Sequence, residues 1–119
     1  TYHHMRGHQS CTQAYAADAL HGEQVLQTKL FRPPHGRMRY SQKKAMLDAG
    51  YTIYLWDVLT HDYNPCYSVE KMLKIVQQYT RNGSIIVMHD SLKSKDRVLK
   101  LLPCAIEWLQ EQGYKLERL

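Results

Sequence analysis

The stretch Ser84-Ile85-Ile86-Val87-Met88-His89-Asp90 shows most directly how this chain folds. Its run of four consecutive apolar residues, most of them β-branched, predicts a short buried strand. Asn82 and Gly83 directly precede the stretch and form a typical turn sequence. The strand ends in His89 and Asp90, so polar groups stand at its carboxyl end, where α/β proteins collect their functional residues.

Helical patterns flank this strand on both sides. Before it, Ser68 can cap a helix whose apolar residues recur every three or four positions, at Val69, Met72, Leu73, Val76 and Tyr79. After it, a helix is expected over residues 96–112, with a kink or a new start at Pro103. A final strand is expected over residues 114–119.

The first half of the chain repeats this alternation. A helical stripe of apolar residues runs through positions 15–26, with Ser10 or Thr12 as its N-cap, and residues 30–31 predict a short strand. Ser41 can cap a second helix that ends before Gly50. Next come an expected buried strand and a polar loop, over residues 51–56 and 57–67.

Strands and helices therefore alternate along the whole chain, which predicts an α/β fold with parallel strands in a sheet or a β/α barrel. The length of 119 residues predicts a single domain, 1–119. Segments 32–36, 57–63 and 89–90 each follow a strand. Their Arg, Asp and His side chains are therefore expected at one edge of the sheet, around one pocket.

Composition argues against several functions. The chain is 44% hydrophobic with a net charge of +5, and no segment approaches the roughly 20 apolar residues that a membrane-spanning helix needs. Basic residues are densest at positions 32–44, but no motif there would enter a groove or stack on bases. We therefore expect an ordinary solvated face and no nucleic-acid partner. The three cysteines form neither a metal motif nor a disulfide pattern.

Polar residues at the strand ends are candidates for acid–base chemistry. His89 can act as a general acid or base, with Asp62 on the preceding loop as its carboxylate partner; alternatively, a backbone carbonyl satisfies its ring. Arg32, before two prolines, could orient a carboxylate through a bidentate contact or could be an ordinary surface arginine. The backbone N–H groups of His35 and Gly36 could face an oxyanion.

His4 is the candidate metal ligand. Zinc sites combine two or three imidazoles with a carboxylate, often with two histidines four residues apart. His4 and His8 have that spacing, but Gly7 lies between them and weakens any helix there. A histidine-rich terminus is as often a solvated loop or an expression tag as a metal site.

Together, and in this order, these segments resemble the polysaccharide deacetylase family, the carbohydrate esterases with a NodB-homology domain. Arg32-Pro33-Pro34-His35-Gly36 is similar to the family loop R-x-P-Y-G, and residues 57–63 (Asp-Val-Leu-Thr-His-Asp-Tyr) resemble its aspartate-rich fourth motif. Residues 85–91 resemble its L-x-H motif, and Thr1-Tyr2-His3-His4 resembles the end of H-[S/T]-x-x-H. The resemblance covers nearly the whole chain.

The resemblance implies a distorted (β/α) barrel and a hydrolase that removes acetyl groups from N-acetylated, or else O-acetylated, carbohydrate with the help of a divalent metal, most often zinc. It implies that His89 is the acid that protonates the leaving amine, that Asp62 tunes His89, and that Arg32 orients a catalytic aspartate. The remaining implied roles are metal binding by His4 and lining of the substrate site by His35 (through its backbone), Tyr63 and Val87.

Two parts of the family pattern are missing. No T-F-D-D segment supplies the base and the metal aspartate. Asp18 and Asp48 are poor substitutes, because they lie in predicted helices. The first metal histidine would precede Thr1. We therefore expect the C-terminal part of a deacetylase domain, inactive by itself, whose open sheet edge could pair with a second copy. The alternative is a catalytically inactive relative that binds carbohydrate or serves as a scaffold.

Overall fold

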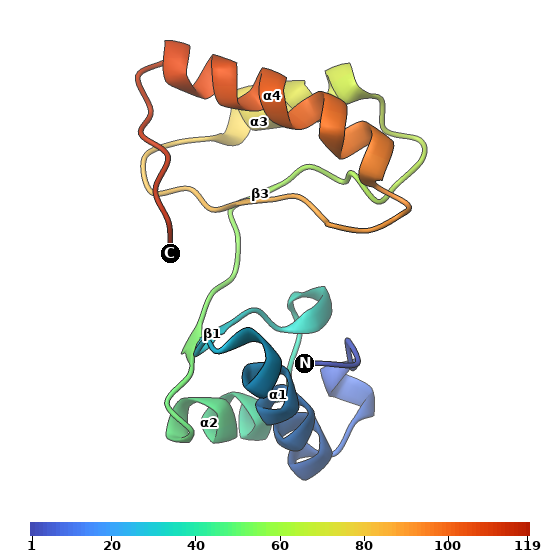
Figure 1. Ribbon diagram of the computed structural model, residues 1–119, viewed down its shortest axis with the longest axis vertical. Helices are drawn as coiled ribbons and strands as arrows, with labels where there is room; N and C mark the ends of the chain where they lie inside the picture. The colour runs from blue at the N-terminus through green and yellow to red at the C-terminus, as the bar shows by residue number, and fades with distance from the viewer. The chain divides into compact units, whose positions relative to one another are not determined.

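A computed structural model describes residues 1–119 and divides the chain into two compact units, Thr1–Leu55 and Trp56–Leu119 (Figure 1). Each unit contains two α-helices and one pair of short parallel strands. The predicted alternation of helices with parallel strands is therefore confirmed. No helix is long and apolar enough to cross a membrane.

The first unit places two helices against the strand pair β1–β2. Its elements are α1 (Thr12–Leu26), β1 (Leu30–Phe31), α2 (Tyr40–Asp48) and β2 (Thr52–Ile53), with 3-10 turns at Gly7–Gln9 and Pro34–Gly36. Leu30 lies opposite Thr52 and Phe31 lies opposite Ile53. The buried core of this unit consists of Tyr15, Ala19, Phe31, Met46 and Tyr51.

The second unit has the same composition of elements: β3 (Val58–Leu59), α3 (Val69–Tyr79), β4 (Ile86–Val87) and α4 (Lys95–Glu111). Figure 1 shows α3 and α4 on the same side of β3. The core there is formed by Val58, Val76, Ala105 and Leu109. Because β3 and β4 are parallel, the segments that follow them leave at the same edge.

One of the three predicted helix N-caps is confirmed and two are wrong. The Ser68 hydroxyl accepts a hydrogen bond from the Lys71 backbone N–H at 3.2 Å, as expected for the N-cap of α3. By contrast, neither Ser10 nor Thr12 caps α1, whose N-cap is Cys11 and has no side-chain hydrogen bond.

Ser41 does not cap α2 either, because it already lies within the helix. Its hydroxyl is instead 2.7 Å from the Thr12 hydroxyl. The Gln42 side chain reaches back and accepts a hydrogen bond from the backbone N–H of Arg39, the N-cap residue, at 2.8 Å. The backbone N–H of Arg39 is thus satisfied by the Gln42 side chain rather than by a serine hydroxyl.

The strand predicted over residues 51–56 is shorter than expected. Only Thr52–Ile53 belong to the ladder, although the Tyr54 N–H still donates to the Phe31 carbonyl at 2.9 Å. The partner strand β1 runs through Arg32 into two prolines, which have no N–H to donate. Pairing therefore cannot extend further along β2.

Two predicted segments are wrong in kind. Residues 57–67, expected as a loop, contain β3, and Val58 there is only 1% exposed because it packs into the core. Residues 114–119 form no strand. Only Tyr114 packs against the core, and the five residues after it are exposed. Pro103 does not start a new helix, since α4 runs through it.

Candidate acid–base site

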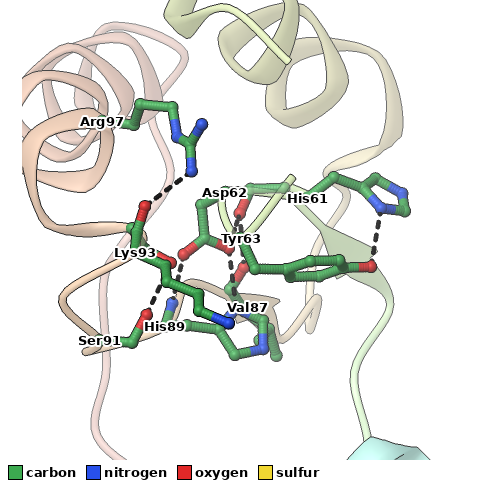
Figure 2. A network of polar contacts seen from close by, with 10 residues as sticks. His61, Asp62, Tyr63, Val87, His89, Ser91, Lys93 and Arg97 are labelled. Atoms are coloured by element: carbon green, nitrogen blue, oxygen red, sulfur yellow. Dashed lines mark hydrogen bonds and ion pairs between the residues drawn. The ribbon is translucent and has the colours of Figure 1, made fainter. Parts of the chain in front are cut away.

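Parallel pairing of β3 with β4 brings Asp62 and His89 together. Val58 lies opposite Ile86 and Leu59 lies opposite Val87, so the chain leaves both strands in the same direction. Asp62 follows three residues after β3, and His89 follows two residues after β4. Figure 2 shows the Asp62 carboxylate directed at His89. The predicted convergence of functional residues at strand ends is thus observed for this pair.

Asp62 holds His89 through two contacts at once. The His89 backbone N–H donates to Asp62 Oδ2 at 2.7 Å, and the ring Nδ1 lies 2.8 Å from Oδ1. An ionised carboxylate can only accept hydrogen bonds, so Nδ1 carries a proton and donates it. The other ring nitrogen, Nε2, is thereby left for a second partner. The side chain of His89 is 35% exposed, so that partner can come from solvent or from a ligand.

Thr60 completes the surroundings of the carboxylate. Its hydroxyl lies 3.0 Å from Asp62 Oδ1 and 2.9 Å from the Val87 carbonyl, and both Thr60 and Asp62 are fully buried. Sequence analysis did not single out Thr60. Its position two residues before Asp62 was the available signal, because residues two apart in an extended segment point to the same face.

The Asp62 carboxyl is ionised at neutral pH. Burial by itself raises the pKa of Asp62, but the hydrogen bonds from the His89 side chain and backbone, the charge of His89 and the bond from Thr60 together hold this pKa below its usual value. A buried negative charge with these donors is therefore fixed beside the imidazole.

Aromatic rings adjoin the exposed part of His89. The Tyr63 ring meets the His89 ring edge-on, with centroids 5.2 Å apart. The Tyr63 hydroxyl in turn lies 3.1 Å from His61 Nδ1, on the side away from Asp62 (Figure 2). His61 has a left-handed backbone (φ 59°), which is uncommon for a residue with a side chain. Tyr63 thus lies directly beside the His89 ring.

Val87 also lies at this site but is almost completely buried. Its side chain is 1% exposed, and its carbonyl lies within hydrogen-bond distance of Thr60. Asp62, Tyr63, Val87 and His89 therefore form one cluster in the second unit. The remaining predicted site residues, His4, Arg32 and His35, belong to the first unit.

The loop that follows Arg32 contains a short 3-10 turn at Pro34–Gly36. Arg32 is exposed directly after β1, and the two prolines behind it are buried. His35 adopts a left-handed conformation (φ 57°). The Gly36 N–H donates to the Pro33 carbonyl at 2.9 Å, so the expectation that it faces an oxyanion is wrong. The loop turn itself uses this donor.

His4 lies next to His35. Their rings meet edge-on with centroids 5.0 Å apart, and His4 also has a left-handed backbone (φ 53°). Nowhere in the chain do three or more His, Cys, Asp or Glu side chains form a group that could hold a metal ion. The residues of this chain therefore do not fit a complete metal centre by themselves.

A second histidine–aspartate pair, missed in the sequence, lies in the first unit. The His3 backbone N–H donates to Asp18 Oδ2 at 2.9 Å, and the His3 ring Nδ1 contacts Oδ1 of the same carboxylate. Burial raises the pKa of Asp18, but the hydrogen bonds and charge of His3 and a bond from Thr1 hold it below its usual value. Asp18 thus anchors the segment that carries His4.

Comparison with known proteins identifies the fold and its relatives. No protein-family profile matches the sequence. The chain superimposes on a crystal structure of a peptidoglycan N-acetylglucosamine deacetylase with a TM-score of 0.93 and 23% identity, covering 100% of this chain and 58% of that one. A family 4 carbohydrate esterase from Streptomyces lividans, in complex with acetate, gives a TM-score of 0.82 and 25% identity, over 92% and 58%.

The sequence comparison agrees. The chain is 28% identical over 123 residues to a peptidoglycan-N-acetylglucosamine deacetylase of Bacillus cereus, a match that covers 97% of this chain and 57% of that protein. The fold is thus an α/β arrangement that corresponds to part of the carbohydrate esterase family 4 fold. The chain is a relative of the polysaccharide deacetylases of that family and spans a little more than half of the length of the proteins it matches.

Proposed function

We propose that this chain supplies the proton-donating side of a deacetylase that hydrolyses acetyl groups on N-acetylated, or else O-acetylated, carbohydrate. One observation carries the proposal: His89 is held twice by a buried carboxylate at the ends of two paired parallel strands. This position is where α/β folds place their chemistry. The relationship to family 4 carbohydrate esterases supports the choice of reaction.

His89 is the proposed general acid. With Nδ1–H donated to Asp62, a proton on Nε2 faces the open side of the ring. As the bond between the acetyl carbon and the sugar nitrogen breaks, that proton passes to the nitrogen, so the sugar leaves as a neutral amine. Asp62 is a positioning residue, because it orients the ring and its negative charge stabilises the protonated imidazole.

The remaining assignments complete this proposal. Arg32 would orient a catalytic aspartate, and His4 would contribute one ligand to a divalent metal, most often zinc. Tyr63, next to His89, would form one wall of the acetyl pocket. The family resemblance assigns further positions of that pocket to the His35 backbone and to Val87. The proximity of His4 to His35 supports placing the metal ligand and the His35 loop together.

A His89→Gln variant of the full-length protein tests the acid assignment. Release of acetate from an N-acetylglucosamine oligosaccharide should fall by about 10² to 10⁴-fold, which is the usual contribution of a general acid. Metal content, measured by elemental analysis, should stay unchanged. His21→Gln, at an exposed histidine of α1, is the matched control. Full activity of H89Q with an unaltered pH profile would refute the assignment.

A second candidate function is carbohydrate binding without hydrolysis. The observation that favours it is that no group of three or more metal-ligating side chains forms in this chain. The two candidates differ in one measurement. A binding protein would retain N-acetylglucosamine oligosaccharides in isothermal titration calorimetry but release no acetate, whether or not zinc is added, and H89Q would leave its affinity unchanged.

A further inference from the structure

His61 contacts two tyrosines, and the proposed reaction assigns it no role. Its Nδ1 lies 3.1 Å from the Tyr63 hydroxyl, and its ring packs against the Tyr67 ring with centroids 4.9 Å apart. Lys71 Nζ in turn lies 4.0 Å from the centre of the Tyr67 ring. Tyr67 directly precedes the N-cap of α3, so the imidazole of His61 packs against a ring that adjoins the first turn of that helix.

The backbone of His61 has an unfavourable conformation that a turn holds in place. Its φ of 59° lies in the left-handed region, which glycine and asparagine adopt more readily than most residues. Its carbonyl accepts a hydrogen bond from the Asn64 N–H at 2.8 Å, which closes the turn. Such strained residues are concentrated at functional sites. The strain therefore directs attention to what the side chain at position 61 contacts.

Tyr63 is the ring that links His61 to the proposed proton donor. It is 45% exposed, and its ring meets the His89 ring edge-on with centroids 5.2 Å apart. Exposed side chains change rotamer within picoseconds to nanoseconds when nothing holds them. Figure 2 shows that the hydroxyl of Tyr63, at the far end of its ring, is the group bonded to His61. This hydrogen bond opposes rotation of the ring away from His89.

We propose that His61 is a positioning residue of the acid–base site, which fixes the Tyr63 ring beside His89 through the Tyr63 hydroxyl. The inference rests on the proposed deacetylase function. Asp62 holds the His89 ring at Nδ1, and the fixed Tyr63 ring limits the tilt of the imidazole about that hydrogen bond. The proton on Nε2 thus keeps its direction toward the substrate nitrogen. A phenol hydroxyl both donates and accepts, so the contact forms with either tautomer of His61.

Kinetics of the full-length protein on an N-acetylglucosamine tetrasaccharide test this role. Tyr63→Phe removes the hydroxyl and keeps the ring, while His61→Phe removes Nδ1 and keeps a ring against Tyr67. Each should lower kcat by about threefold to tenfold and change KM by less than about twofold, because the orientation of the acid matters most in the transition state. The double variant should lose no more than either single one, because all three lack the same hydrogen bond. Tyr40→Phe, at a tyrosine that is 83% exposed, is the matched control.

Asparagine at position 61 separates the hydrogen bond from the stability of the turn. His61→Asn places a polar atom near the position of Nδ1 and tolerates the left-handed backbone, so it should keep most of kcat. Wild-type kcat in both phenylalanine variants, losses that multiply in the double variant, or an H61N variant as slow as H61F would each overturn the inference.

NMR of the histidine ring protons gives a readout without catalysis. The His89 resonances, assigned by their absence in H89Q, are shifted by the ring current of Tyr63 beside them. Y63F and H61F should move these resonances toward the values of an unstructured peptide, whereas H61N should not. Unchanged resonances in H61F refute the positioning role even in a protein that releases acetate. Shifted resonances in a protein that releases no acetate refute the proposed reaction alone.

Discussion

The two histidine–aspartate pairs of this protein are built with the same contacts but lie in different surroundings. In both, the backbone N–H of the histidine donates to Oδ2 of the aspartate, and the ring Nδ1 faces Oδ1. Asp62 is completely buried and His89 is 35% exposed. The side chain of Asp18 is 9% exposed and that of His3 is 68% exposed.

This difference teaches that pair geometry alone does not define a catalytic site. His89 comes from a strand end, is flanked by Tyr63, and its carboxylate partner has a third donor in Thr60. His3 stands in an exposed terminal segment and packs against Tyr2. An imidazole that a buried carboxylate holds and that is partly shielded from solvent can transfer a proton to a bound substrate, whereas the mostly exposed His3 mainly fixes the terminal segment.

The largest expected effect separates the two pairs by activity. Asp62→Asn should lower acetate release by about 10² to 10⁴-fold, because the new amide removes the negative charge that stabilises protonated His89 and can no longer accept two hydrogen bonds in the same way. Asp18→Asn is the matched control and should change kcat by only a few-fold. Equal losses in the two variants would show that the pairs do the same work.

The second effect is on stability and its pH dependence. At neutral pH, Asp62→Asn should lower the free energy of unfolding by about 2 kcal/mol, since a buried charge-assisted network loses its acceptor. The folded-state pKa of Asp62 is depressed, so its stabilisation is fully present above the ordinary Asp value of 3.8 and is lost as the pH falls through the lower folded value.

Urea unfolding at a series of pH values measures this effect. The difference in stability between the wild type and D62N should be constant near neutral pH and should shrink below about pH 4. The pKa of Asp18 is depressed in the same direction, so D18N should show the same trend with a smaller plateau. A difference that grows on acidification would contradict the assigned ionisation of Asp62.

The smallest effect tests the third donor to Asp62, the hydroxyl of Thr60. Thr60→Val keeps the shape of the side chain and removes the hydroxyl, so it should cost about 1 kcal/mol of stability and a few-fold in kcat. Thr60→Ser retains the hydroxyl and should keep most of the activity. If T60V keeps its activity and T60S loses it, the methyl group rather than the hydrogen bond is what matters at this position.

The acid–base pair of the second unit could be predicted from the sequence, and the corresponding pair of the first unit could not. His89 could be named because it ends a buried strand, and Asp62 because it lies on the polar loop that follows another expected strand; their contact is observed. Tyr63 was named only through the family resemblance. The pair His3–Asp18 could not be predicted. Asp18 lies in a helix, and the spacing of apolar residues along that helix does not indicate which distant segment its polar residues will contact. Likewise, the turn in which Gly36 donates to Pro33 depends on local dihedral angles that residue types do not determine.

His4, His35 and His61 share the left-handed backbone described above, and this has a consequence for protein engineering. The conformation costs a residue with a β-carbon of order 1 kcal/mol, whereas glycine and often asparagine adopt it readily. Replacing any of the three by glycine should therefore raise the free energy of unfolding by the backbone term, less the side-chain contacts that are lost. Where a more stable glycine variant has lower activity, the histidine side chain has been retained for function at a cost in stability.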